Sequence, residues 1–146
     1  MNPYFLSENY LLRGATLGDV DSVHVICEFR EFSAGEPIVA TQDKDKDIMI
    51  VLEGRARVVT IQGDLIDELR AGAMIGEISF LDGQERTANV FSVGTSKIAV
   101  IPATKLRELM AQSPRLEVTI YKNAALALCQ RLRDANQQIE SLMVPC

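Results

Sequence analysis

The sequence predicts a mainly β domain with helices at both ends, and two observations lead to this fold class. Between Val23 and Ile101, short β-branched or alternating apolar runs recur about every ten residues, separated by glycine-containing turns and without helical segments between them. After Pro102 the apolar spacing changes from 2 to about 3.6 residues. We therefore expect an antiparallel sandwich, roll or barrel followed by helices.

The elements follow one another in three segments of one domain, residues 1–146, because this length is typical of a single domain with its own core. Residues 1–22 contain apolar groups that predict one or two short helices, with Thr16 as a candidate N-cap. Residues 23–101 supply the strands. Eight runs have strand character: "VHVICEF", "EPIVA", "DIMIVLEG", "ARVVTIQG", "LIDELRAG", "AMIGEISF", "RTANVFSV" and "SKIAVIP". The alternating charges of Asp43–Asp47 predict a solvated turn, because they lack the spacing and the glycine of a calcium loop.

Two helices are predicted in residues 102–143. The first is the short amphipathic segment "ATKLRELMAQ", and Ser113-Pro114 then predicts the start of a longer helix that runs to Met143. Apolar residues in the long helix recur in alternating steps of four and three. This heptad stripe consists of Tyr121, Ala125, Leu128, Leu132, Ala135, Ile139 and Leu142. We expect a coiled-coil-like helix that forms a parallel homodimer; packing onto the chain's own sheet is a compatible alternative.

Composition excludes several classes of protein. The net charge of −5 argues against a nucleic-acid partner, which would call for a basic surface. No apolar run approaches the roughly 20 residues needed to cross a membrane, and the N-terminus lacks the pattern of a secretory signal. The three scattered cysteines, Cys27, Cys129 and Cys146, indicate reduced thiols in a cytoplasmic protein. With a single histidine in the chain, we expect no metal site.

The segment "GEISFLDGQERTANV", residues 76–90, is the strongest candidate for a binding site. Considered alone, its Asp82-Gly83 pair predicts a hairpin, with Glu77 and Arg86 as a surface pair across two strands. The apolar surroundings of Glu77 favour a partly buried site instead. An arginine, a neighbouring hydroxyl and backbone N–H groups freed by glycine together suit a phosphate. A carboxylate beside them suits a ligand that also carries a sugar hydroxyl.

This segment resembles the phosphate-binding cassette of cyclic nucleotide-binding domains, a family that includes bacterial cAMP receptor proteins, kinase regulatory subunits and nucleotide-gated channels. Gly76-Glu77, the nine-residue step to Arg86 and the following Thr-Ala match the kinase and channel spacing. "FSAGEPIVATQDKDKDIMIVLEGRARV" resembles the family's early strands, and "LRAGAMIGE" its approach to the cassette. The resemblance implies an eight-stranded antiparallel, jelly-roll-like β-roll with two helices after it. No helix-turn-helix follows, so we expect either a free-standing sensor or an excised module.

The resemblance also implies a role for each cassette residue. Arg86 would pair with the cyclic phosphate, near Ser79, Thr87 and Ala88. Glu77 would accept the ribose 2′-hydroxyl, with Gly76 and Ile78 beside the sugar. Residues expected at the base are Thr87, Val58, Ile66, Asn136 and Arg133, although Val58 and Ile66 are equally consistent with ordinary core positions. Among the lid candidates, Arg131 and Arg133 are better interpreted as solvated helix charges.

The implied function is a non-enzymatic sensor that binds a cyclic nucleotide and signals by repositioning its last helix. cAMP is the favoured ligand and cGMP the alternative, since Thr87 permits guanine without excluding adenine. No cofactor is expected. The expected partners are the nucleotide, a second copy of the chain and a protein effector. The alternative function is a dimerising interaction module of the same fold with no nucleotide or another small ligand, consistent with Ala135 and with Met74-Ile75 before Gly76. Catalysis is not expected, because Glu77 and Asp82 have no accompanying nucleophile or base.

Overall fold

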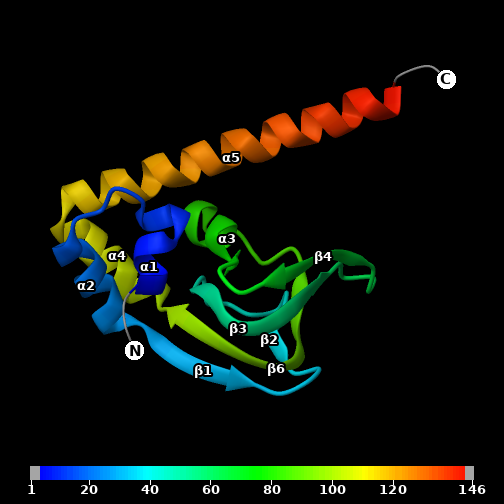
Figure 1. The fold of residues 1–146 in the computed structure, drawn as a ribbon, viewed down its shortest axis with the longest axis horizontal. Helices are drawn as coiled ribbons and strands as arrows, with labels where there is room; N and C mark the ends of the chain where they lie inside the picture. The colour runs from blue at the N-terminus through cyan, green and yellow to red at the C-terminus, as the bar shows by residue number, and fades with distance from the viewer. Residues whose placement is uncertain (1–3, 144–146) are drawn as a thin grey trace.

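The computed structural model describes residues 4–143 and shows one antiparallel sheet flanked by helices (Figure 1). The N-terminal segment comprises α1 (Tyr4–Glu8), the 3-10 helix η1 (Tyr10–Leu12) and α2 (Leu17–Ile26). The strands are β1 (Glu28–Phe32), β2 (Pro37–Val39), β3 (Ile48–Val59), β4 (Leu65–Arg70), β5 (Met74–Ile75) and β6 (Asn89–Ile101). The other helices are α3 (Glu77–Asp82), α4 (Ala103–Gln112) and α5 (Pro114–Met143). No helix within residues 4–143 is long and apolar enough to span a membrane.

The expectation of eight strands is wrong for the described residues, which form a six-stranded sheet. The runs on either side of Gly54 belong to the single strand β3, and those on either side of Gly94 belong to β6. Gly54 has φ +90°, and an added Cβ would lie only 2.6 Å from the carbonyl oxygen of Thr95. The register of β3 against β6 shifts on both sides of Glu53. Glycine here produces a bend within a paired strand, where the sequence pattern predicts a turn between two strands.

Two other predicted strands contain helix. Residues 23–26 of "VHVICEF" complete α2, whose N-cap is Thr16 as predicted: its Oγ1 accepts from the backbone N–H of Asp19 at 3.1 Å. "AMIGEISF" supplies only β5 before the chain turns into α3. The hairpin interpretation of Asp82-Gly83 is therefore wrong. Gly83, at φ +71°, is the C-cap of α3, and its N–H bonds to the carbonyl oxygen of Ser79.

Strands β3 and β6 separate two apolar cores. On β3, Ile48 and Ile50 face the core shared with the helices, whereas Met49 and Val51 face the core inside the curled sheet. This alternation follows from the two-residue period of a strand. β6 lies at the centre of the sheet and pairs with β1, β2 and β3, while β3 also pairs with β4 and β5. The inner core leaves room for the cavity described below.

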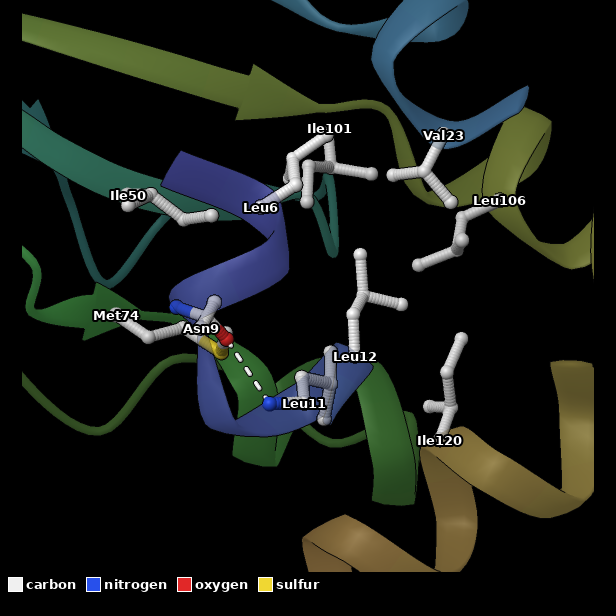
Figure 2. A pocket seen from close by; sticks show the side chains of 10 residues that line it. All are labelled: Leu6, Asn9, Leu11, Leu12, Val23, Ile50, Met74, Ile101, Leu106 and Ile120. Atoms are coloured by element: carbon white, nitrogen blue, oxygen red, sulfur yellow. Dashed lines mark hydrogen bonds between the residues drawn. The ribbon is translucent and has the colours of Figure 1, made fainter. Parts of the chain in front are cut away.

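The core beneath the helices contains one small gap (Figure 2). Its volume is about 10 Å³, which is no more than the space that one water molecule needs. Apolar side chains dominate its wall, and the polar exception, Asn9, is already bonded: its carboxamide oxygen accepts from the N–H of Leu11 at 3.0 Å and caps η1. We therefore interpret this gap as imperfect packing between the N-terminal helices and the sheet.

Helix α5 buries apolar side chains on the domain through its first half, where Leu116, Ile120 and Ala124 are buried. Asn123 fastens it to the N-terminal segment by donating to the carbonyl oxygens of Leu11 and Arg13, both at 2.9 Å. The predicted start at Ser113-Pro114 is confirmed within one residue. The helix then passes α3 and ends as a projecting rod (Figure 1).

The heptad stripe lies on a different face of α5 from the buried residues. Its members Leu132 and Ile139 are 63% and 53% exposed. The stripe is thus not used for packing within the chain, and its pairing with a second copy stays a prediction.

Candidate functional site

A cavity of about 390 Å³ opens inside the curled sheet, a size typical of small-molecule sites. One wall comes from the β3–β4 hairpin, the other from α3 and the residues before β6, and one α5 side chain reaches it. The lining residues are Val39, Val58, Ile66, Asp67, Leu69, Met74, Ile75, Gly76, Glu77, Ile78, Ser79, Arg86, Thr87, Ala88, Val90 and Arg131. The β3–β4 wall is mainly apolar, whereas the α3 wall carries the charged pair Glu77 and Arg86.

Arg86 has a buried guanidinium that the protein satisfies only on one side. Its side chain is 3% exposed, and Nη2 donates to the carbonyl oxygen of Asp47 at 2.8 Å and to Oδ1 of Asp45 at 3.1 Å. Nε and Nη1 have no hydrogen-bond partner among the described residues. Unpaired buried donors are costly, and more so when they carry charge. The arrangement favours an anion that accepts from Nε or Nη1.

Gly76 makes room for this arginine. It adopts φ +88°, and an added Cβ would overlap Nη1 of Arg86 and lie 2.8 Å from the carbonyl oxygen of Asp47. Gly76 is also the N-cap of α3 and provides no side-chain acceptor for the helix's first amide groups. One residue thus allows both the buried guanidinium and the open start of α3.

Glu77 lies beside Arg86 on the cavity wall but pairs with a different arginine. It is buried, and one of its carboxylate oxygens accepts from Nη2 of Arg131 on α5 at 2.6 Å. Tyr10 of η1 is close to this ion pair. Burial, followed by the negative charge of Glu77, raises the pKa of the Tyr10 phenol to about 12, while Arg131 acts in the opposite direction. Three distant segments of the chain therefore meet at Glu77.

Two contacts connect the site to α4. Asp47 has two roles. Its carbonyl oxygen accepts from Arg86, and its side-chain Oδ1 accepts from the backbone N–H of Ala103 at 2.8 Å. One turn later, Arg107 donates to the carbonyl oxygen of Phe80 in α3, and its guanidinium carbon lies 4.4 Å from the centre of the Phe80 ring. The Asp45–Asp47 turn, which holds Arg86, and helix α3 are thus both bonded to the first turns of α4.

The structure brings most of the predicted site residues to one cavity. Those found on its wall are Gly76, Glu77, Ile78, Ser79, Arg86, Thr87, Ala88, Val58 and Ile66. Arg133 and Asn136 are exposed on α5 and are not among the residues that line the cavity, although Arg131 on the same helix is. Their contact with a base stays a prediction.

Sequence reasoning did not assign Asp45, Asp67 or Tyr10 to the site, and it weighed Arg131 as a lid contact but preferred a solvated helix charge. The turn at Asp43–Asp47 is not simply solvated, since Asp45 pairs with Arg86 and Asp47 caps α4. Arg131 reaches the cavity wall, so interpreting it as a solvated charge is wrong. Its spacing was a usable signal: it follows the buried Ala124 by seven residues, about two turns, and so occupies the same side of the helix.

Within residues 4–143, no group of three or more His, Cys, Asp or Glu side chains is arranged to hold a metal ion.

Comparison with known proteins gives consistent matches. Residues 29–113 match the family model described as "Cyclic nucleotide-binding domain". The chain is 28% identical over 137 residues to glutaminase 1 of Bradyrhizobium diazoefficiens, covering 94% of this chain and 22% of that protein. It is 31% identical over 121 residues to the cyclic nucleotide-gated channel alpha-2 of Bos taurus, covering 77% and 18%. The chain thus spans only about a fifth of the length of these relatives.

Solved structures share this architecture. The catabolite activator protein of Thermus thermophilus aligns with TM-score 0.75 and 25% identity, over 92% of this chain and 63% of that chain. The Toxoplasma gondii PKA regulatory domain, crystallised with cAMP, aligns with TM-score 0.71 and 23% identity, over 84% and 48%. At 23% identity, the similarity to the Toxoplasma gondii domain shows a shared fold only.

The position of Tyr10 makes stability depend on pH in the alkaline range. The phenol has pKa about 12 in the folded chain and an ordinary value of 10.0 when unfolded. Below pH 10 the phenol is protonated in both the folded and the unfolded chain, so its full contribution to the free energy of unfolding is present. Between about pH 10 and 12 the unfolded chain ionises first, and the free energy of unfolding falls as pH rises. We expect Tyr10→Phe to flatten this part of the urea-denaturation profile.

Tyrosinate absorbance provides a direct check of the same group. One of the three tyrosines should titrate late in the wild type, and Glu77→Gln should move that titration toward lower pH. Three tyrosines that all titrate near the ordinary value would contradict the placement of Tyr10 beside Glu77.

Proposed function

Because the chain belongs to the cyclic nucleotide-binding domain family, we propose that it is a non-enzymatic sensor module that binds a cyclic nucleotide in the cavity beside Arg86. The observation that carries the proposal is the buried Arg86 guanidinium, whose Nε and Nη1 lack partners among the described residues at the wall of a cavity of about 390 Å³. The exocyclic oxygens of a cyclic phosphate are acceptors for these unpartnered donors. The neighbouring carboxylate of Glu77 suits the ribose hydroxyl of the same ligand.

The proposed pose follows the two walls of the cavity. The phosphate lies against Arg86, with Ser79, Thr87 and Ala88 around it, and the sugar lies at Gly76, Glu77 and Ile78. The base extends between the apolar Val58 and Ile66 toward Thr87, with Asn136 and Arg133 approaching when α5 closes over it. We favour cAMP as the ligand and keep cGMP as the alternative.

Loss of the arginine should remove most of the affinity. We expect Arg86→Ala to weaken cyclic nucleotide binding by about 2–5 kcal/mol, because a partly buried phosphate charge would be left unpaired. Isothermal titration calorimetry with cAMP and with cGMP measures this difference. Arg30→Ala is the matched control, since Arg30 is an exposed arginine that pairs with Glu28 on β1, away from the cavity.

Circular dichroism of both variants establishes that they remain folded. Saturable binding with the same affinity in wild type and Arg86→Ala would refute the assignment of the phosphate to this site. Absence of any binding to the wild type would favour the alternative function, an interaction module without a nucleotide ligand.

The proposed signal is a displacement of α5. Arg131 ties this helix to Glu77, the carboxylate proposed to accept the ribose hydroxyl. A sugar at Glu77 therefore changes the environment of the only described ion pair between α3 and α5. A ligand can shift the helix only by the difference in its affinity for the two positions, and this ion pair gives such a difference a structural origin.

Arg131→Gln should uncouple the helix from the ligand. Spin labels on Cys129 and on Asp64→Cys, in a background with Cys27 and Cys146 replaced by serine, report the distance from α5 to the β3–β4 turn. We expect cAMP to change this distance in the parent and to change it much less with Arg131→Gln. Lys122→Gln, an exposed charge on α5, is the matched control. An equal response in both variants would contradict the role of Arg131.

We further propose that α5 forms a homodimer through the heptad stripe, which offers exposed apolar side chains over several turns. Such a dimer would present a joint surface to a protein effector.

Two charges in the stripe should dissociate this dimer. Leu132→Asp combined with Ile139→Asp places like charges at facing positions, so we expect a monomer at micromolar concentration in analytical ultracentrifugation. Gln130→Asp with Gln137→Asp, which lie outside the stripe, should leave the dimer intact. A wild type that sediments as a monomer would refute the proposed assembly.

A further inference from the structure

Asp67 places a carboxylate on the mainly apolar wall of the cavity. On β4 it pairs in register with Val58 of β3, and Leu69, two residues later, pairs with Ala56. Cross-strand partners and residues two apart share a face of the sheet. Val58 and Leu69 both pack against the inner core, and Ala56 is buried within it. Asp67 therefore shares the inward face and lines the cavity with them.

This carboxylate has no cation to pair with among the described residues. The next residue, Glu68, lies on the outer face and forms an ion pair with Arg55 at 2.9 Å. Asp67 accepts one local bond, from the backbone N–H of Glu68 to Oδ1 at 2.8 Å, which leaves Oδ2 available. Asp67 is exposed at the cavity, so its free Oδ2 can accept from a donor on a bound ligand.

The donor cannot be the phosphate, and the apolar neighbours of Asp67 indicate which part of the ligand it meets. Arg86 lies on the opposite wall, and a carboxylate beside a phosphate would repel it. Val58 and Leu69 suit the flat face of a base. An ionised carboxylate accepts hydrogen bonds and donates none, so it can bind only an N–H group at the edge of that base.

Adenine and guanine differ at this edge in a way that a carboxylate distinguishes. Adenine carries an amino donor at position 6, where guanine carries a carbonyl acceptor; the amino group of guanine is at position 2, and its N1–H donor lies between these two positions. In a base whose position 2 lies toward Thr87, on the phosphate wall, position 6 and the neighbouring N7 are on the side of β4, and N1–H is turned away from Asp67. There Asp67 would bond to the amino group of adenine, whereas it would face the carbonyl oxygen of guanine acceptor to acceptor.

We propose that Asp67 is the specificity-determining residue of the site and accepts a hydrogen bond from the 6-amino group of an adenine base. The inference rests on the proposed function and adds to it a preference for cAMP over cyclic nucleotides with a 6-carbonyl group. Thr87 tolerates a 2-amino group, and Asp67 requires an amino group at position 6.

The experiment compares cAMP with cIMP, which has a carbonyl at position 6 and no amino group at position 2. Thr87 thus cannot account for a difference between these two ligands. We expect the wild type to bind cAMP at least about tenfold more tightly, as for a hydrogen bond to a charged group. Asp67→Asn should bring the two affinities within about twofold, because a carboxamide can accept from an amino group or donate to a carbonyl. Calorimetry with cGMP then measures how a 2-amino group on the base changes the affinity further.

Two further variants sharpen the result. Asp67→Ala should weaken cAMP binding and leave cIMP binding little changed or improved, because the repulsion is removed with the acceptor. Glu68→Gln removes one negative charge from the outer face of the same strand and should leave the ratio of affinities unchanged. Asp67 is exposed, so these substitutions test recognition in a chain that still folds.

An affinity ratio that is the same in wild type and Asp67→Asn would overturn the inference, and so would a wild type that prefers cIMP. In either case a loss of binding in Arg86→Ala would leave the proposed function in place. A wild type that binds none of the three nucleotides would overturn both.

Discussion

The buried guanidinium of Arg86 is the constraint on which the rest of the site depends. A charge with so little access to water must be paired, and among the described residues it is paired only through the turn at Asp45–Asp47. That turn is fixed in its own right, because the Asp47 carboxylate caps α4. Glycine is required at position 76, since any side chain there would occupy the place of the guanidinium. The cavity, the start of α3 and the position of α4 thus follow from accommodating a single cation.

Much of this arrangement could be predicted from the sequence, and the errors have physical causes. The strand period and the Thr16 cap depend on neighbours within a few positions, so the local pattern predicts them, whereas the cassette residues were identified through the resemblance to a known family. Gly54 and Gly83 were misassigned because a glycine at positive φ serves a bend, a helix end or a turn equally well, and only tertiary pairing decides between them. The contact of Arg131 with Glu77 joins residues 54 positions apart, and no local pattern specifies it.

Three carboxylates around the cavity each pair with a different arginine. Arg86 meets Asp45, Glu77 meets Arg131, and Glu68 on the outer face meets Arg55. Asp67 alone among these carboxylates faces inward without a cation. An acidic chain can therefore hold an anionic ligand without a positive surface, because the attraction is confined to one guanidinium in a desolvated setting, where charges interact more strongly than in water.

The end of α5 would act as a lever arm, because its last described contact with the domain is the ion pair of Arg131 with Glu77. Residues 132–143 extend about 18 Å beyond that contact, at 1.5 Å per residue. A rotation of about 10° there would carry the far end of the helix through about 3 Å, while atoms at Glu77 would move by a small fraction of that distance. A molecule of this shape would thus convert a small adjustment at the cavity into a larger displacement at the end of a helix.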